Sequence, residues 1–244
     1  MAKIKVGVNG AKGKMGQASC AAIAADADLD LVFEADQGDD LSSKVKDSGA
    51  KVVVDFTQAS VFFQNASAIV EAGASPVIGT SGFTESDVAK LKSLCAAKSL
   101  GGIIAPNFSI SAVLMMKYAS DAAKYLPDVE IVEYHHDKKE DSPSGTAVKT
   151  AELIRESLGK DLPEKPNKDI IPGGRGASMA GVHIHSIRVP GVIANQEVVF
   201  GGLGQTLKIA SYTINRESFM PGVCLACKKV MGLDELVYGL EHVL

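Results

Sequence analysis

Over its first 110 residues the chain alternates between short apolar runs and longer stretches in which apolar residues recur every three or four positions. A short continuous apolar run predicts a buried strand, and the longer period predicts a helix. Strands that alternate with helices form right-handed crossovers and a parallel sheet. The predicted strands are residues 4–8, 29–33, 52–54, 76–78 and 102–104, and the predicted helices are residues 17–25, 60–72 and 84–97, the last with a capping box of Thr84 and Asp87.

The pattern changes after residue 110. A predicted helix, 111–125, leads into a short strand, 129–132, and a second helix, 147–158. A stretch rich in proline and glycine, 161–181, is expected to be a loop. The strands that come next follow each other through turns, which is typical of an antiparallel or mixed open sheet. These strands are residues 182–189, 194–200 and 205–211, and the chain ends in predicted helices, 219–230 and 233–244, that we expect to pack back on the first half.

A glycine-rich turn follows the first predicted strand directly. Gly10, Gly13 and Gly16 give the pattern G-x-x-G-x-x-G between a buried strand and an alanine-rich helix. Glycines at such a turn let a pyrophosphate approach the backbone at the N-terminus of a helix. The pattern alone is a weak signal, and a turn that only joins strand to helix is the alternative. The strands and helix around it favour a dinucleotide-binding site.

An acidic residue follows the second predicted strand, where dinucleotide-binding folds bind the adenosine ribose. Asp36 is preferred over Glu34 because it lies just beyond the strand end. A 2′-phosphate would favour a neighbouring arginine or lysine, but the neighbour is Gln37. The sequence therefore favours NADH over NADPH, and both stay open because an amide can also donate to a phosphate. A loop carboxylate without a ligand is the alternative.

Polar segments also follow the third, fourth and fifth predicted strands. Because ligands of open parallel sheets bind beyond the carboxyl ends of the strands, we expect these segments to face one crevice. The nicotinamide half of a cofactor is expected along the last two. The segments are Asp55-Phe56-Thr57, Gly79-Thr80-Ser81 and Ala105-Pro106-Asn107-Phe108.

The densest group of reactive side chains lies between strand 129–132 and helix 147–158. Residues 133–147 contain two histidines, two lysines, four carboxylates and a Ser-Pro-Ser-Gly-Thr turn. Ser144 or Thr146 can cap the helix, whose N-terminus favours a bound carboxylate or phosphate. Histidine and lysine beside such an anion-binding helix N-terminus indicate a proton-transfer site. A solvated charged loop is the alternative, but it does not explain the rigid turn.

Charge and hydrophobicity limit the partners. A net charge of −4 argues against nucleic acid as the main partner. The sequence contains no apolar run long enough to span a bilayer, and its start does not have the pattern of a signal peptide, so we expect a cytoplasmic protein. An open sheet leaves a face for a covering helix or a second subunit. We therefore predict a homo-oligomer, a tetramer, formed through strands 182–211.

Two short motifs near the end of the chain have alternative interpretations. Cys224 and Cys227 form a C-x-x-C, which can be a redox pair, but the surrounding helical period favours two buried structural cysteines. His183 and His185 share a face of one strand. A metal site there would need a third ligand, and none is evident, so surface or interface residues are favoured over a metal site.

Several of these segments together resemble one family. The segment Glu133-x-His135-His136-x-x-Lys139-x-Asp141-x-Pro143-Ser144-Gly145-Thr146-Ala147 is highly specific, whereas the glycine pattern is not. Along essentially the whole chain, the motifs are similar to those of the 4-hydroxy-tetrahydrodipicolinate reductases, also called dihydrodipicolinate reductases, of the bacterial diaminopimelate and lysine pathway. The other motifs are Gly10-x-x-Gly13-x-Met15-Gly16, Asp55-Phe56-Thr57, Gly79-Thr80-Ser81-Gly82, Ala105-Pro106-Asn107-Phe108-Ser109 and Arg188-x-Pro190-Gly191.

The resemblance implies both a fold and an activity. The fold is α/β, with an N-terminal Rossmann dinucleotide-binding domain made of residues 1–108 and 217–244. Residues 109–216 would form an α+β domain with an open mixed sheet, which binds the substrate and makes the tetramer. The activity is the NAD(P)H-dependent reduction of a cyclic imine dicarboxylate, 4-hydroxy-tetrahydrodipicolinate, to tetrahydrodipicolinate, with hydride transfer to C4.

The resemblance also implies roles for single residues. His135 would be the proton donor, and Lys139 would be the second catalytic acid and a substrate contact. No metal ion is expected, and Gln37 stands where many members carry arginine, which weighs against NADPH. The implied substrate contacts are His136, Lys139, Ser144, Gly145 and Thr146, and the implied cofactor contacts are Gly10, Ala11, Lys12, Gly13, Lys14, Met15, Asp36, Gly79, Thr80, Ser81, Ala105, Pro106, Asn107 and Phe108.

Two functions outside this family stay open from the sequence. A redox-sensing NAD(H)-binding regulator without chemistry of its own would use the same Gly10 turn, but it would usually carry a DNA-binding element, and none is visible. A homoserine or semialdehyde dehydrogenase is the other. The semialdehyde type needs a nucleophilic cysteine in a substrate crevice, whereas Cys20 and Cys95 lie on predicted helices of the first half.

Overall fold

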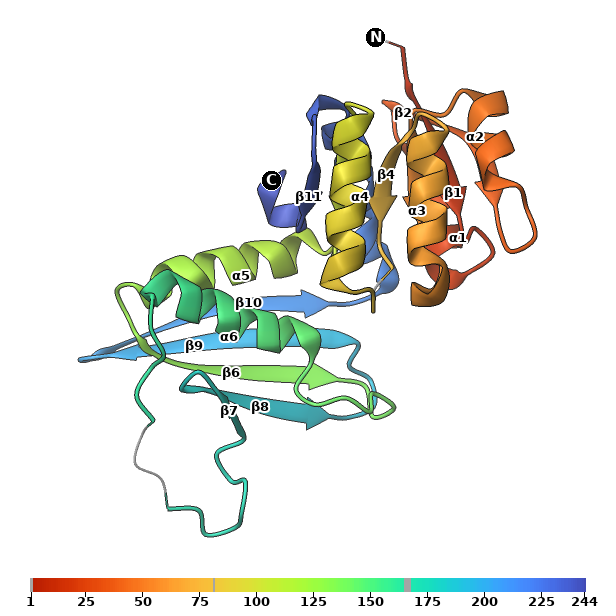
Figure 1. The fold of residues 1–244 in the computed structure, drawn as a ribbon. Helices are drawn as coiled ribbons and strands as arrows, with labels where there is room; N and C mark the ends of the chain where they lie inside the picture. The colour runs from red at the N-terminus through yellow and green to blue at the C-terminus, as the bar shows by residue number, and fades with distance from the viewer. Residues whose placement is uncertain (1, 81, 165–167) are drawn as a thin grey trace. The chain divides into compact units, whose positions relative to one another are not determined.

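The computed structural model of the chain describes residues 2–80, 82–164 and 168–244. The chain forms two compact units (Figure 1), one of Met1–Ile110 with Arg216–Leu244 and one of Ser111–Asn215. The first and the last segments of the described chain both belong to the first unit. The first unit contains a parallel sheet and the second a mixed sheet, so the predicted α/β fold class is confirmed.

Six parallel strands form the sheet of the first unit, in the order β2-β1-β3-β4-β5-β11. All four residues of β3 are buried, because helices cover both faces of the sheet. Helices α1 and α7 pack together on one face, and α2, α3 and α4 pack in a row on the other (Figure 1). The elements are β1 (Ile4–Asn9), α1 (Lys14–Ala25), β2 (Leu29–Ala35), α2 (Leu41–Ser48), β3 (Val52–Asp55), α3 (Phe62–Glu71), β4 (Ser75–Ile78), α4 (Glu85–Ala97), β5 (Gly102–Ile104), α7 (Met220–Lys229) and β11 (Leu236–Tyr238), with short 3-10 helices at Ala59–Val61, Arg216–Phe219, Val230–Gly232 and Leu240–His242.

Five strands form the mixed sheet of the second unit, in the order β10-β9-β6-β8-β7. β6 and β8 are parallel, and the other neighbouring pairs are antiparallel. Helices α5 and α6 lie along one face of the sheet (Figure 1), and the Ser120 hydroxyl of α5 donates to the Leu153 carbonyl of α6 at 3.2 Å. The elements are α5 (Ile110–Ala123), β6 (Asp128–His135), α6 (Gly145–Leu158), β7 (Ala177–Met179), β8 (Val182–Arg188), β9 (Ala194–Gly202) and β10 (Gln205–Thr213).

The predicted helix over residues 233–244 is wrong. Leu236–Tyr238 form β11, which pairs in parallel with β5 at the edge of the sheet. The N–H of Gly102 donates to the Glu235 carbonyl, and the N–H of Gly239 donates to the Ile104 carbonyl. The unpaired backbone groups of β5 therefore outweigh the leucine spacing that favoured a helix.

Other elements also differ from the prediction. β6 runs from Asp128 to His135 instead of over residues 129–132, so His135 lies on the strand and not in the loop. α1 begins at Lys14 instead of residue 17, because Gly16 belongs to the first helical turn. α2 was not predicted, although Asp40 caps its N-terminus and Gly49 ends it in the left-handed conformation. β7 lies within the predicted loop 161–181, where it pairs with the edge of β8.

The two short motifs near the end of the chain have structural partners. Cys224 and Cys227 are buried free thiols on α7, which confirms the structural interpretation, and burial raises the pKa of both. His183 is 6% exposed and bonds the Arg175 carbonyl through Nδ1. The expectation of a surface residue is therefore wrong for His183. Among the described residues, no group of three or more histidine, cysteine or acidic side chains is arranged to hold a metal ion.

Candidate active site

The first unit holds the glycine-rich turn between β1 and α1. Gly10 has a φ of 79°, in the left-handed region that favours glycine, and a Cβ there would lie 2.8 Å from the Phe56 carbonyl oxygen. Helix α1 starts at Lys14, and its N-cap, Gly13, has no side chain to bond the N–H groups of the first turn. That turn contains no acidic residue at any of its described positions. The helix N-terminus is therefore suited to a phosphate group.

Asp36 follows β2 and lies next to this turn. Its Oδ2 accepts from the N–H of Lys12 at 2.8 Å, and its Oδ1 accepts from the N–H of Gln37 at 2.8 Å. These two bonds hold the pKa of Asp36 below its ordinary value, and the bond from Lys12 has the larger effect. Because each carboxylate oxygen has a second lone pair, Asp36 can still accept bonds from ribose hydroxyls.

A cleft of about 570 Å³ connects the turn with Asp36. Of the predicted cofactor residues, Gly10, Gly13 and Asp36 line it, while Ala11, Lys12, Lys14 and Met15 belong to the same turn without lining the cleft. The start of α3 forms part of the opposite wall and was missed from the sequence, where Gln64 and Asn65 within an apolar helical period were the only signal. The remaining lining residues are Asn9, Gln37, Gly38, Asp39, Leu41, Phe56, Thr57, Gln58, Ser60, Val61, Gln64 and Asn65.

A buried carboxylate ties the cleft to the neighbouring strand ends. Asp55, at the end of β3, is 1% exposed. It accepts bonds from Asn9 Nδ2 at 2.8 Å, Thr80 Oγ1 at 3.1 Å and Asn65 Nδ2 at 3.2 Å. The backbone N–H and the hydroxyl of Thr57 donate to it as well. The ends of β1, β3 and β4 and the start of α3 are therefore held together by one side chain.

The other predicted cofactor residues lie further along the same edge of the sheet. Gly79 and Thr80 follow β4, and Ala105 to Phe108 follow β5. The rings of Phe108 and Phe56 meet edge to face, with centroids 5.7 Å apart. Ser81 lies outside the described residues. The described lining of the cleft includes none of this second group, so the predicted cofactor residues form two groups along one sheet edge.

A methyl group at Gly16 should damage this turn. The Cβ of an alanine would lie 2.0 Å from the Gly10 carbonyl oxygen and 2.7 Å from Ala11 Cα, and both are backbone atoms. We expect Gly16→Ala to lower the free energy of unfolding by at least ~1–3 kcal/mol, the usual effect of overpacking, and to weaken binding of the reduced dinucleotide. Thermal unfolding and calorimetric titration measure both quantities. Gly232→Ala is the control, because a Cβ at Gly232 meets no heavy atom within 4 Å; equal behaviour of the two variants would contradict the prediction.

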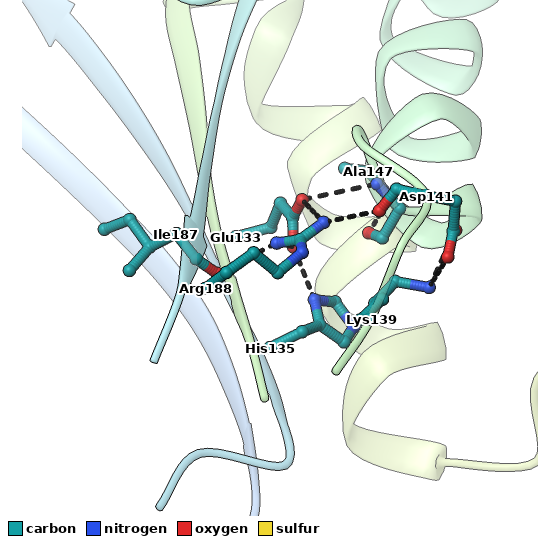
Figure 2. Close-up of polar contacts among 8 residues, drawn as sticks. Glu133, His135, Lys139, Asp141, Ala147, Ile187 and Arg188 are labelled. Carbon is teal, nitrogen blue, oxygen red and sulfur yellow. Dashed lines mark hydrogen bonds and ion pairs between the residues drawn. The ribbon is translucent and has the colours of Figure 1, made fainter. Parts of the chain in front are cut away.

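In the second unit, His135 lies in a cluster with Glu133 and Arg188 (Figure 2). Residues two apart on a strand share a face, and the Glu133 carboxylate bonds Nδ1 of His135. The parallel register of β6 and β8 places Arg188 opposite His135. Arg188 Nη2 donates to Glu133 Oε1 at 2.8 Å, and Nη1 donates to Oε2 at 3.0 Å. Glu133 is fully buried, so this charge-assisted pair is shielded from water.

Lys139 belongs to the loop that follows His135. Its Nζ lies 2.7 Å from both carboxylate oxygens of Asp141 and its side chain is 21% exposed. The hydrogen bond from Lys139 is the first cause of the lowered pKa of Asp141. Arg188 Nη2 also donates to the Asp141 carbonyl at 2.8 Å. Arg188 therefore links the loop that carries Lys139 to the strand that carries His135 (Figure 2).

The start of α6 completes this region. Ser144 is 2% exposed and caps the helix: its Oγ accepts from the N–H of Ala147 at 3.3 Å, and its own N–H donates to Glu133 Oε1 at 3.3 Å. Gly145 and Thr146 form the first turn, and a Cβ at Gly145 would meet no heavy atom within 4 Å. His136 is exposed at the start of the loop. A helix N-terminus with open space beside it, at the end of the loop that carries His136 and Lys139, is suited to a carboxylate ligand.

The pKa of Glu133 reflects these contacts. Burial alone would raise it, but hydrogen bonds from His135, Arg188 and Ser186 outweigh burial and lower it from 4.5 to about 2. Glu133 therefore remains a carboxylate, and a hydrogen-bond acceptor, at every pH at which the protein is expected to be assayed. Sequence reasoning assigned no role to Glu133 or Arg188. The available signal was a glutamate two residues before a histidine on a strand.

The lowered pKa predicts an acid-dependent loss of stability. A carboxylate with a lower pKa in the folded chain stabilises the fold above its unfolded pKa, and this contribution is lost as the pH falls towards the folded pKa. We expect the free energy of unfolding to fall by up to about 3 kcal/mol from this group between pH ~5 and ~2. Urea unfolding at stepped pH measures the slope. Glu133→Gln should show a shallower slope, and parallel curves for both proteins would contradict the assignment.

Comparison with known proteins decides the family. Sequence profiles described as "Dihydrodipicolinate reductase, N-terminus" and "Dihydrodipicolinate reductase, C-terminus" match residues 4–108 and 111–244. The chain belongs to the dihydrodipicolinate reductase family. The resemblance in the sequence is confirmed, and with it the assignment as an oxidoreductase. A regulator without chemistry is set aside, because the dihydrodipicolinate reductases are enzymes.

Relatives of the dihydrodipicolinate reductase family match over the full length. A Legionella pneumophila (strain Corby) protein named 4-hydroxy-tetrahydrodipicolinate reductase is 47% identical over 242 residues, covering 99% of this chain and 100% of the relative. A Streptococcus pneumoniae (strain Hungary19A-6) protein of the same name is 48% identical over 255 residues, covering 99% of each. The structure of dipicolinate-bound dihydrodipicolinate reductase from Paenisporosarcina sp. TG-14 matches with a TM-score of 0.92 and 39% identity, covering 99% of this chain and 100% of that one.

The fold extends beyond the dihydrodipicolinate reductases. GenD2 from gentamicin A biosynthesis, solved in complex with NAD, matches with a TM-score of 0.60 at 14% identity, over 95% of this chain and 87% of that chain. At this identity the likeness concerns the fold alone. Within the ranges that the structure describes, every helix is too short or too polar to span a membrane.

Proposed function

We propose that this chain reduces 4-hydroxy-tetrahydrodipicolinate to tetrahydrodipicolinate in the diaminopimelate and lysine pathway. Its full-length relatives are named for this activity, and the related Paenisporosarcina structure holds dipicolinate, a cyclic dicarboxylate. The observation that carries the proposal is the junction of β6 and α6. There an imidazole, an ammonium group and a helix N-terminus occur within residues 135–146.

The first unit fits a nicotinamide dinucleotide. The turn at Gly10 has no room for a side chain, α1 has no side-chain cap, and Asp36 has free lone pairs at the cleft. When bound, the reduced nicotinamide would supply a hydride to C4 after, or with, the loss of water, in which the 4-hydroxyl and a proton of the neighbouring ring carbon leave and that carbon becomes able to accept a new proton. The residues that would hold the cofactor are Gly10, Ala11, Lys12, Gly13, Lys14, Met15, Asp36, Gly79, Thr80, Ser81, Ala105, Pro106, Asn107 and Phe108.

The second unit supplies the proton and binds the substrate carboxylates. Lys139 attracts the carboxylates by charge, and His136 can donate a ring N–H. The first turn of α6, at Gly145 and Thr146, offers backbone N–H groups, and Ser144 fixes that turn as its cap. His135 gives a proton to the ring carbon beside C4, because an imidazolium can act as a general acid. Lys139 is the second acid.

NADH is the proposed preferred cofactor. The carboxylate of Asp36, which lines the cleft, would repel a 2′-phosphate. The other carboxylate of the lining, Asp39, is already paired with Lys44 Nζ at 3.2 Å and adds little. Gln37 offers no compensating positive charge. We expect kcat/KM to be higher with NADH than with NADPH, and we expect Asp36→Ala to narrow this difference. An enzyme that prefers NADPH, or an unchanged ratio in the variant, would contradict the preference.

Steady-state assays test the proposed reaction. With freshly made substrate, we expect the absorbance of the reduced nicotinamide to fall with time and dipicolinate to compete with the substrate. Aldehyde substrates of other dehydrogenases should give no change. If neither reduced cofactor is oxidised in the presence of substrate, or if the aldehydes are reduced instead, the proposed function is wrong.

A cytoplasmic homotetramer is part of the same proposal. The face of the second sheet away from α5 and α6 carries Val132, Tyr134, Val199 and Tyr212, and Tyr212 is 55% exposed. A partner subunit would cover these apolar side chains. Light scattering measures the mass, and a monomer at assay concentration would contradict this part.

A further inference from the structure

Glu133, His135 and Arg188 form a trio of carboxylate, histidine and arginine. The strand β6 carries a second such trio around Glu130, and a comparison of the two shows which features are particular to the Glu133 trio. Glu130 is three residues away and lies on the opposite face of the strand. Its carboxylate accepts from His185 Nε2 at 2.8 Å and pairs with the guanidinium of Arg175. The Glu130 side chain is 32% exposed, whereas that of Glu133 is fully buried.

The two trios use opposite nitrogens of the imidazole. His185 bonds its carboxylate through Nε2, the nitrogen farther from the backbone, so that this nitrogen is occupied. His135 bonds Glu133 through Nδ1, the nitrogen nearer to the backbone. Among the described residues nothing bonds Nε2 of His135, whose side chain is 15% exposed at the end of β6. Only the Glu133 trio therefore presents the distal nitrogen for proton transfer.

We infer that Glu133, held by Arg188, is the positioning residue that makes His135 a proton donor through Nε2. The inference deepens the proposed function and rests on the role given there to His135. Both oxygens of Glu133 are fixed by the two Arg188 bonds, and the N–H of Ser144 adds a third fixed donor. A buried carboxylate with these partners cannot rotate, so the ring that it bonds keeps one orientation.

The same contact assigns the protons. Glu133 accepts the Nδ1 proton of His135, so the imidazolium carries its second proton on Nε2. In the proposed step the Nε2–H bond breaks, a C–H bond forms at the ring carbon beside C4, and the electron pair delivered to the substrate forms that bond. The imidazole becomes neutral and keeps its Nδ1 proton, and Glu133 stays ionised throughout. The carboxylate stabilises the imidazolium before the step, while Arg188 limits this effect.

Glu133→Gln tests the inference. The amide can donate to Nδ1 and so holds His135 as the neutral tautomer, which is a poor acid. We expect kcat to fall by roughly 10²-fold, and by no more than in His135→Gln, because a positioning residue acts through the group that it positions. The groups around the imidazole are Glu133 and Arg188, with Lys139 and Asp141 in the adjoining loop. Without the carboxylate charge, the decrease of kcat on the alkaline side of its pH profile (the high-pH limb) should begin at a lower pH. The affinity for dipicolinate, measured by calorimetry, should change little.

Three further variants separate this role from a structural one. Glu130→Gln removes the matched trio on the other face and should leave kcat and its pH limb unchanged. The double variant of Glu133→Gln with His135→Gln should be no slower than His135→Gln alone. Glu133→Asp keeps the charge beside Arg188 but shortens the reach to Nδ1, so it should fold and lose kcat even where Glu133→Gln fails to fold.

The outcomes distinguish the two proposals. If His135→Gln is impaired while folded Glu133→Gln or Glu133→Asp keeps the wild-type kcat and pH limb, the positioning role is wrong and the proposed function stands. The positioning role is also wrong if Glu133→Gln lowers kcat equally with and without His135. If His135→Gln turns over like the wild type, the proposed proton donor itself is wrong.

Discussion

Replacing His135 by glutamine is expected to lower kcat by roughly 10²–10⁴-fold, the usual contribution of a general acid. Glutamine is polar and of similar length, so it can occupy the place of the imidazole beside Glu133. It cannot release a proton near neutral pH, however, and the electron pair that reaches the substrate would have to take its proton from water. Steady-state assays with saturating substrate and reduced cofactor measure the loss.

The contrast between turnover and binding makes this prediction specific. The substrate carboxylates are assigned to Lys139, His136 and the start of α6, so the affinity of His135→Gln for dipicolinate should change only a few-fold. The decrease of kcat at high pH should become weaker, because the variant lacks the proposed proton donor. His242→Gln is the control, because His242 is exposed and belongs to the first unit. A His135→Gln enzyme with wild-type turnover would remove His135 from the role of proton donor.

The strand and helix pattern could be predicted from sequence wherever one period dominates. β3 is a run of valines and is buried throughout, and the Thr84 capping box at α4 forms as predicted. Residues 233–244 were predicted wrongly because their leucine spacing fits a helix. Their structure is determined instead by the unpaired backbone groups at the edge of β5, which exist only in the assembled sheet. A local pattern cannot reveal that distant backbone groups need partners.

The candidate site likewise has features that could be predicted from the sequence and features that could not. His135, Lys139 and the Ser144 cap could be singled out because reactive residues and a rigid turn are dense within one segment. The role of Arg188 could not be predicted in this way. Arg188 belongs to β8, and only the parallel register of β6 and β8 places it opposite His135. Asp55 is a similar case: its partners Asn9, Asn65 and Thr80 come from three separate elements. Polar networks across strands depend on register, which the sequence does not state.

Replacing Lys139 by alanine is expected to raise KM and lower kcat together. The ammonium group lies 2.7 Å from both oxygens of Asp141, so it is already held where a carboxylate can accept from it. A charge-assisted hydrogen bond contributes about 1.5–3 kcal/mol, so its loss alone should reduce kcat/KM by roughly 10- to 150-fold. Because Asp141 would lose its cation, the variant also leaves an unbalanced negative charge near the proposed binding site of the substrate carboxylates. This charge adds to the loss of affinity. Calorimetry with dipicolinate and steady-state kinetics measure the two effects.

The neighbouring lysine provides the matched control for this prediction. Lys138 is exposed, and Lys138→Ala removes the same charge one residue away, so it should keep KM and kcat. Lys139→Arg separates the two roles of Lys139: it retains the positive charge and should retain much of the affinity, but a guanidinium does not release its proton near neutral pH. If Lys139→Arg restores both affinity and turnover, Lys139 acts only by charge. If Lys139→Ala leaves KM and kcat unchanged, the substrate does not bind at this loop, because a diacid cannot lose a cationic hydrogen-bond partner without a loss of affinity.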